Sequence, residues 1–197
     1  GEKTKSGYGN SGQFGGPKSV GAQLKTDDTV KKPLFTMDGL QRTLKPYDDF
    51  KRWVNEKIGL QFGGDYNVFL QDASQSMGEN TAVGGVFRFF GQWDLLGRDS
   101  KNTGTLVYKV ESRHRLGTDV APQELAGEIG YAGLTALTFS NAGWELTNFF
   151  WRQELLDGRL GFVLGQVDVT DYVDTYGMVS PWTDFSNLAF STDPTIP

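Results

Sequence analysis

The feature that most constrains what this chain can fold into is a period of two in hydrophobicity that begins after Gly59. From Leu60 to Leu70 the even positions are apolar residues or glycine, whereas most of the odd positions are polar. Alternate side chains of an extended strand point to opposite faces, so the pattern predicts a strand with one apolar and one polar face. Residues 87–95 and 106–115 repeat it.

A hairpin signal fixes the register of two more strands. Residues 157–158 are Asp-Gly, a favoured two-residue turn between antiparallel strands. Leu155 is then expected opposite Leu160, and Trp151 opposite Leu164, on one face. The other face carries Asn148, Phe150, Arg152 and Glu154 across from Gly161, Val163 and Gly165. An apolar face again opposes a polar face that contains charges.

The predicted fold class is all-β. Each strand has about 9 to 13 residues, which is the length that a tilted strand needs to cross a bilayer. The connections at 96–104 and 157–158 are short, whereas those at 72–83, 116–143 and after Asp168 are long. Short turns at one end and long loops at the other are typical of a transmembrane antiparallel β-barrel, with the short turns periplasmic.

A soluble β-sandwich that binds carbohydrate is the alternative, because its sheets also have one wet face. Aromatic residues near the strand ends and repeated unlike charges on the polar faces favour the barrel. In a barrel the charged face lines a water-filled lumen. The residues expected to line the pore are Arg88, Gln92, Asp94, Lys109, Glu111, Arg113 and Arg152.

Three segments are expected along the chain. Residues 1–33 are a Gly/Ser/Lys-rich leader that is too polar to bury a core and is interpreted as flexible. Residues 34–58 form a periplasmic N-terminal segment with an amphipathic helix at 47–58, which either braces the barrel mouth or lies on the membrane surface. Residues 59–197 hold about five strands and their loops. Residues 7–12 have the spacing of a dinucleotide fingerprint but lack its strand and helix.

Composition excludes several classes of function. The chain has 19 basic and 24 acidic side chains and no basic stripe, so it is not expected to bind nucleic acid. It has no cysteine and one histidine, His114, which excludes thiol catalysis and a multi-histidine metal site. We expect no enzyme activity and no cofactor; glycoside hydrolysis by paired carboxylates is the one enzyme hypothesis that composition leaves open.

Five stretches carry a family resemblance: Trp93-Asp-Leu-Leu-Gly-Arg-Asp99, residues 102–117, Gly143-Trp-Glu-Leu-Thr-Asn148, residues 157–168 and residues 180–191. They resemble the carbohydrate-selective porin family called OprB. The resemblance implies an outer-membrane barrel of a Gram-negative bacterium, with sixteen strands when complete, that lets monosaccharides or small carbohydrates diffuse through. Since about five strands are predicted here, we expect this chain to be the N-terminal portion of such a barrel.

The segment after Asp168 is the candidate sugar site. It combines carboxylates, which accept hydrogen bonds from hydroxyls, with aromatic rings that stack on the apolar face of a sugar. The candidate constriction residues are Asp168, Asp171, Asp174, Trp182 and Phe185. The alternative is that these residues cap turns and anchor the loop to the barrel wall. The spacing of the aspartates lacks the alternating ligands of an EF-hand, so no metal is expected.

The expected partners are small carbohydrates, outer-membrane lipid and lipopolysaccharide, and the pattern is also compatible with a homo-oligomer. Arg113 and Arg115 would face lipopolysaccharide phosphates instead of the lumen if the register were shifted by one residue. His114 is expected on the apolar face of its strand, close to a loop.

Overall fold

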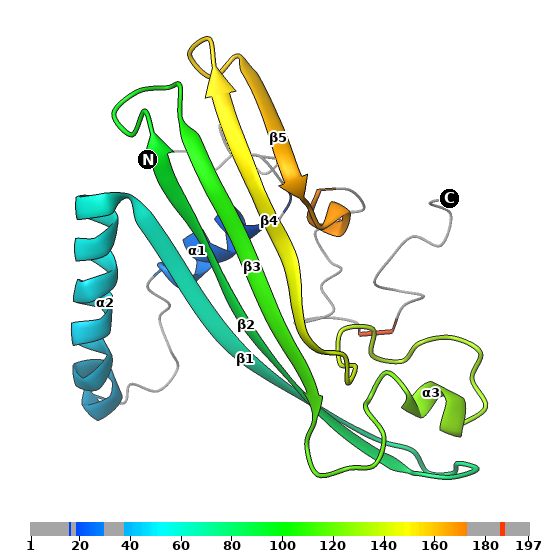
Figure 1. The fold of residues 1–197 in the computed structure, drawn as a ribbon. Helices are drawn as coiled ribbons and strands as arrows, with labels where there is room; N and C mark the ends of the chain where they lie inside the picture. Colours follow the sequence, from blue (N-terminus) through cyan, green and yellow to red (C-terminus); the bar gives the residue numbers. More distant parts are fainter. Residues whose placement is uncertain (1–15, 17–18, 30–37, 173–185, 188–197) are drawn as a thin grey trace, which may run out of the picture. The chain divides into compact units, whose positions relative to one another are not determined.

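The computed structural model describes residues 16, 19–29, 38–172 and 186–187 of the chain (Figure 1). Five strands form one sheet in the order β1-β2-β3-β4-β5. The strands are β1 (Leu60–Asp72), β2 (Thr81–Leu96), β3 (Gly104–Arg115), β4 (Gly143–Leu155) and β5 (Leu160–Gln166). The helices are α1 (Val20–Asp27), α2 (Asp38–Ile58) and α3 (Leu125–Glu128), with a 3-10 turn η1 (Val169–Asp171). The all-β prediction is confirmed; the finer prediction of a closed barrel in a membrane is taken up below as a proposal.

The chain divides into two compact units; β1 to β4 each have residues in both, whereas β5 lies in unit 1. Unit 1 comprises residues 1–63, 90–108 and 148–168. Unit 2 comprises residues 64–89, 109–147 and 169–197.

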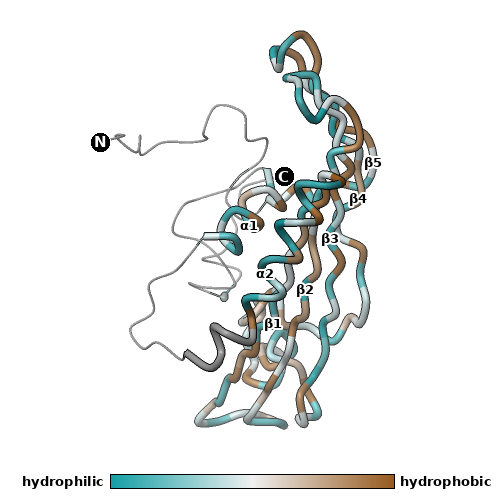
Figure 2. Tube along the Cα trace, turned by 90° about the vertical axis from the view of Figure 1, so that its left-hand side faces the viewer, coloured by the Kyte–Doolittle hydropathy of each residue, from teal (hydrophilic) through white to brown (hydrophobic). Residues whose placement is uncertain are grey.

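Strand alternation is present as the sequence predicts, and Figure 2 shows it as changes of hydropathy along the strands. In β2 the even-numbered residues from Ala82 to Phe90 are all buried, whereas the odd-numbered Phe87 and Phe89 are exposed. We call the shielded side of each strand the inner face and the other side the outer face. In β4 both Thr147 and Asn148 are at least partly shielded, so the alternation breaks there, as it does where a β-bulge adds one residue.

The β4–β5 hairpin has the predicted register. Leu155 pairs with Leu160, Trp151 with Leu164, and the strands are antiparallel. Leu156, Asp157 and Gly158 all have positive φ, at 54°, 59° and 79°. Glycine and aspartate tolerate this left-handed conformation, whereas a leucine rarely adopts it.

The N-terminal region differs from expectation in two ways. The segment 1–33 contains helix α1, because its few aliphatic residues include Val20 and Leu24 at helical spacing, and both are buried. The helix expected at 47–58 is present and ends at Ile58, but it begins earlier, at Asp38, and includes Pro46. Proline removes one backbone donor and strains the preceding turn, but its fixed φ is close to the helical value, so the helix continues through it.

The prediction that the connection at 72–83 is long is wrong. Because β2 begins at Thr81, the connection 73–80 is barely longer than the one at 97–103. Gly84 and Gly85, which directly follow the expected connection, lie inside β2. A β-carbon at Gly84 would meet the Pro122 ring, and one at Gly85 would meet Tyr66, so close approach of side chains explains both glycines.

Candidate functional site

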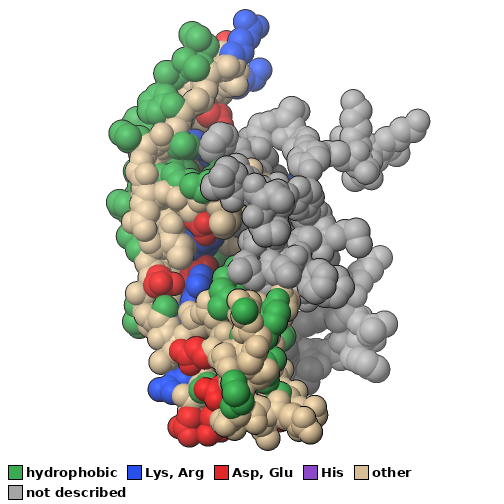
Figure 3. Space-filling model, turned by 90° about the vertical axis from the view of Figure 1, so that its right-hand side faces the viewer, with side chains coloured by type: hydrophobic (Ala, Val, Ile, Leu, Met, Phe, Trp, Pro, Cys, Tyr) green, Lys and Arg blue, Asp and Glu red, His purple; other side chains and the backbone are tan. Residues whose placement is uncertain are grey.

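The inner face buries charged side chains beside apolar ones such as Val86 and Phe90, and the outer face exposes large apolar side chains. On the inner face of β3, Lys109 and Glu111 are buried, each with 3% of its surface exposed. On the outer face, Trp144 is 69% exposed and Leu164 is 73% exposed. Figure 3 shows hydrophobic side chains standing out along one margin, with acidic and basic side chains gathered beside them. Charged residues are almost never buried without partners, so the inner face must satisfy them.

In unit 2 the inner-face charges are paired, either between neighbouring strands or along one strand. Arg88 of β2 donates from Nε to Oδ1 of Asp65 at 2.8 Å and from Nη2 to Oδ2 at 2.6 Å, a bidentate pair with β1. Arg113 of β3 donates from Nη2 to Oε2 of Glu111 at 2.7 Å. The Nε of Arg113 also lies 3.6 Å from a carboxylate oxygen of Glu145 on β4. The pairs leave this part of the inner face polar but close to electrically neutral.

The most deeply buried pair joins β3 to the segment after β5. Lys109 Nζ donates to both carboxylate oxygens of Asp171 in η1, at 3.1 Å and 2.9 Å, and each side chain is 4% exposed. Thr147 Oγ1 donates to the backbone carbonyl of Lys109 at 3.2 Å, which steadies the strand at that point. The segment after β5 therefore folds back onto the inner face of β3 at Lys109.

In unit 1 the inner face carries a polar network with fewer charges. Gln92 Nε2 donates to Gln61 Oε1 at 3.0 Å. Thr105 Oγ1 donates to Asp94 Oδ1 at 2.7 Å. Arg152 Nε is buried, and within the described residues it has no hydrogen-bond partner. Of these side chains, Gln61 and Gln92 are partly exposed and can offer hydrogen bonds to a polar solute that carries no charge.

Helix α1 lies against the inner face of unit 1. A β-carbon on Gly63 of β1 would lie 2.8 Å from the Asp27 carboxylate and 3.0 Å from the ring of inner-face Phe90. Lys51 of α2 holds α1 in this place by donating to Asp27 at 2.6 Å and to Asp28 at 2.8 Å.

The pairing of Lys51 with Asp27 and Asp28, called the Lys51 clasp below, changes the pKa of the Lys51 amine. Burial of the ammonium group disfavours its charge, but hydrogen bonds to Asp27 and Asp28 and their negative charges outweigh this effect. The pKa of Lys51 is therefore raised above its ordinary value of 10.5.

Helix α2 contacts the apolar outer face through Phe62 of β1. The rings of Tyr47 and Phe50 each lie 6.3 Å from that of Phe62 in edge-on geometry. Val54 is buried, whereas Phe50 and Trp53 are exposed. His114 lies on the outer face of β3, as expected, and its Nε2 is 2.8 Å from the hydroxyl of Tyr66.

The structure brings some of the predicted site residues together. Lys109 meets Asp171, and Arg113 meets Glu111, whereas Asp168 is held separately through its backbone N–H, which donates to Asn148 Oδ1 at 2.8 Å. Asp174, Trp182 and Phe185 lie outside the described residues. Glu145, which lies before the break in alternation of β4, and helix α1 were not expected at the site; Asn148 was expected on the polar face but not as a partner of Asp168.

No protein-family model matches the chain, and neither the curated proteins nor the solved structures contain a match to it. Among the described residues, no helix combines the length and hydropathy that crossing a membrane requires. The described part also holds no group of three or more His, Cys, Asp or Glu residues that could bind a metal ion.

Proposed function

We propose that the chain forms part of the wall of a channel in the outer membrane of a Gram-negative bacterium and lets small neutral carbohydrates diffuse through. The observation that carries the proposal is the pattern of burial: large apolar side chains are exposed on the outer face while charges are buried on the inner face. A wall between lipid and an aqueous lumen needs this distribution. A soluble protein rarely leaves so large an apolar surface uncovered.

The soluble β-sandwich is the second candidate, and the same observation weighs against it. A sandwich buries the apolar face of one sheet against the apolar face of another. The described strands form one sheet, and its outer-face residues Val68, Phe149 and Leu164 are exposed. Lipid can cover such a face without any second sheet.

Neutral solutes are favoured by the way the inner-face charges are used. In unit 2 the described basic residues Arg88, Lys109 and Arg113 each pair with a carboxylate. Because paired charges produce only a weak field in the lumen, ions of either sign gain little from the wall. The similarity of five stretches to the OprB family is the reason for proposing carbohydrates among the neutral solutes, and the proposal assigns no catalysis to the chain.

Two segments of the chain narrow the proposed lumen. The segment after β5 lies on the inner face through Asp171 and Lys109, and helix α1 lies on it through Asp27 and the Lys51 clasp. A sugar in a wide lumen makes too few simultaneous contacts for selectivity, so both segments serve the proposed function by bringing polar groups within reach.

The proposal requires further strands. In the described sheet β1 and β5 each have one hydrogen-bonded neighbour. Unpaired strand edges are not tolerated in hydrocarbon, so both must pair with strands of the same protein or of further copies when the sheet crosses a membrane.

Reconstitution tests the proposal. Purified protein inserted into planar bilayers is expected to give stepwise conductance, and liposomes containing it are expected to swell in isotonic glucose. Protein that stays monodisperse without detergent and gives neither signal would support the soluble sandwich and contradict the channel.

A further inference from the structure

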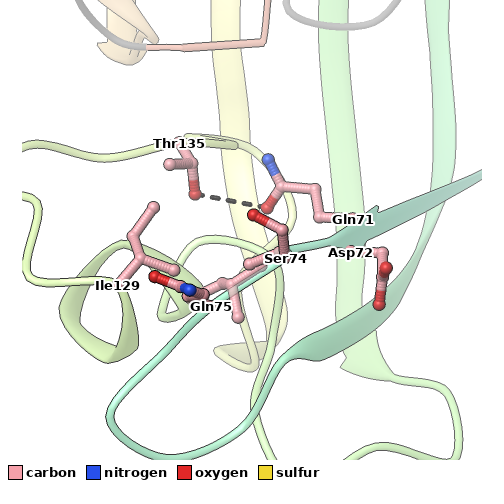
Figure 4. A pocket seen from close by; sticks show the side chains of 8 residues that line it. Gln71, Asp72, Ser74, Gln75, Ile129 and Thr135 are labelled. Atoms are coloured by element: carbon pink, nitrogen blue, oxygen red, sulfur yellow. Dashed lines mark hydrogen bonds between the residues drawn. The ribbon is translucent and has the colours of Figure 1, made fainter.

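A hollow lies beside the end of β1 (Figure 4). Its volume is about 480 Å³, within the range of small-molecule sites. Gln71, Ser74 and Gln75 line it from the end of β1 and the following loop, and Thr135 lines it from the β3–β4 connection. Leu125 and Ile129 supply apolar wall. All of these residues belong to unit 2.

Hydrogen bonds hold the walls of this hollow in place before any ligand arrives. The loop after β1 is closed by Ala73 N donating to Asn80 O at 2.8 Å and is tied to α3 by Met77 N donating to Glu128 O at 2.8 Å. Across the hollow, Thr135 Oγ1 donates to Gln71 Oε1 at 3.2 Å. A ligand therefore finds a preformed site and spends little free energy on ordering the loops.

The polar groups that remain available are uncharged. Gln71 Nε2, Ser74 Oγ and the Gln75 side-chain amide make no hydrogen bond to any other described residue. Amides and a hydroxyl both donate and accept, which matches a molecule with several hydroxyl groups. Among the described residues that line the hollow, Asp72 is the charged one, and its Oδ1 already accepts from Thr81 Oγ1 at 2.6 Å. No lysine or arginine among the described residues lines it, so the described wall offers an anion no positive charge.

We propose that this hollow binds a small neutral molecule with several hydroxyl groups, such as a monosaccharide. Gln71, Ser74 and Gln75 hydrogen-bond its hydroxyls, while Leu125 and Ile129 contact its C–H groups. The biological meaning of this inference rests on the proposed function. The loops that form the hollow join β1 to β2 and β3 to β4, and in the proposed channel this end of the sheet faces the outside of the cell. The hollow then captures solute at the outer mouth of the channel.

The test measures binding of glucose, gluconate and glucosamine to the full chain in detergent micelles by saturation-transfer NMR. Two variants change the hollow: Gln71→Ala with Ser74→Ala removes polar contacts, and Ser74→Phe fills the space. Glu79→Ala is the matched control, because Glu79 is exposed on the same loop but does not line the hollow. We expect both changes in the hollow to weaken glucose binding by about tenfold, the effect of losing one or two hydrogen bonds, and the control to leave it unchanged.

The outcomes separate this inference from the channel proposal. Unchanged glucose affinity in both variants of the hollow, or gluconate binding as tightly as glucose, overturns the inference even if the protein conducts in bilayers. Glucose binding that the variants weaken, in a protein that forms no channel, supports the hollow as a site and contradicts the channel.

Discussion

The buried pair of Lys109 and Asp171 gives the sharpest energetic prediction. Changing Lys109→Met removes the ammonium group and keeps a stem of similar length. The Asp171 carboxylate, 4% exposed, then loses the cation that lies 2.9 Å away. Breaking a buried pair by removing one partner typically costs about 3–5 kcal/mol, because the remaining charge stays in a poorly solvated place.

The protein can avoid that cost by releasing η1 into water, which gives the prediction a local readout. We expect hydrogen exchange of residues 169–172 to accelerate in Lys109→Met and the single-channel conductance to rise as the segment leaves the inner face. The double variant Lys109→Met with Asp171→Leu is expected to regain most of the stability, since it removes both charges.

An exposed pair on α2 provides the control. Arg52 and Asp49 are 2.6 Å apart at helical spacing, with 70% and 52% of their side chains exposed. Solvated pairs of this kind contribute about 0.5 kcal/mol or less, so Arg52→Met should unfold in urea at nearly the wild-type midpoint. Equal unfolding midpoints for Lys109→Met and the wild type, with unchanged exchange at 169–172, would refute the reasoning about the buried pair.

Three further predictions follow from local geometry. Gly91→Val should destabilise the sheet by about 1–3 kcal/mol in urea unfolding, because a β-carbon there meets Tyr108 and lies 2.6 Å from the Gln61 carbonyl oxygen. Gly127→Ala is the control and should be neutral, because a β-carbon at that position meets nothing within 4 Å. The Lys51 clasp, whose amine has a raised pKa, should stabilise α1 fully below pH 10.5 and be lost as the pH rises through the folded-state pKa; Lys51→Met should abolish this alkaline release, measured by proteolysis near α1. Gly158→Ala should destabilise the β4–β5 hairpin by about 1 kcal/mol in thermal unfolding, because Gly158 has a φ of 79°, and an equal melting temperature would contradict this.

The strands and one hairpin register could be predicted because their signals are local. A period of two depends only on neighbouring residues, and Asp157-Gly158 determines which residues of β4 and β5 face each other. The assignment of Lys109, Glu111 and Arg113 to one face followed directly, and their common inner position confirms that part.

Other features depend on contacts between distant residues. The sequence suggested that Asp171 belongs to a constriction, but its partner Lys109 lies 62 positions away and no local pattern joins them. Val20 and Leu24 are two aliphatic residues in a polar stretch, too weak a period to predict α1, which is fixed by tertiary contact with Gly63 and Lys51. The break in alternation at Thr147 and Asn148 likewise has no turn residue to mark it.

The central claim is that the outer face contacts lipid and the inner face contacts water. The chain has no cysteine, so single cysteines can be introduced into a clean background. Val68→Cys and Leu164→Cys report on the outer face, where these residues are 56% and 73% exposed in the absence of lipid. Asn67→Cys and Gln92→Cys report on the inner face without removing an ion pair.

The decisive measurement is the rate at which a membrane-impermeant thiol reagent modifies these four variants in proteoliposomes. The lipid-facing assignment predicts modification at positions 67 and 92 and protection at positions 68 and 164, with protection lost when the lipid is replaced by denaturant. Rapid modification at positions 68 and 164 in intact proteoliposomes, with protection at 67 and 92, would contradict the claim that this sheet is the wall of a membrane channel.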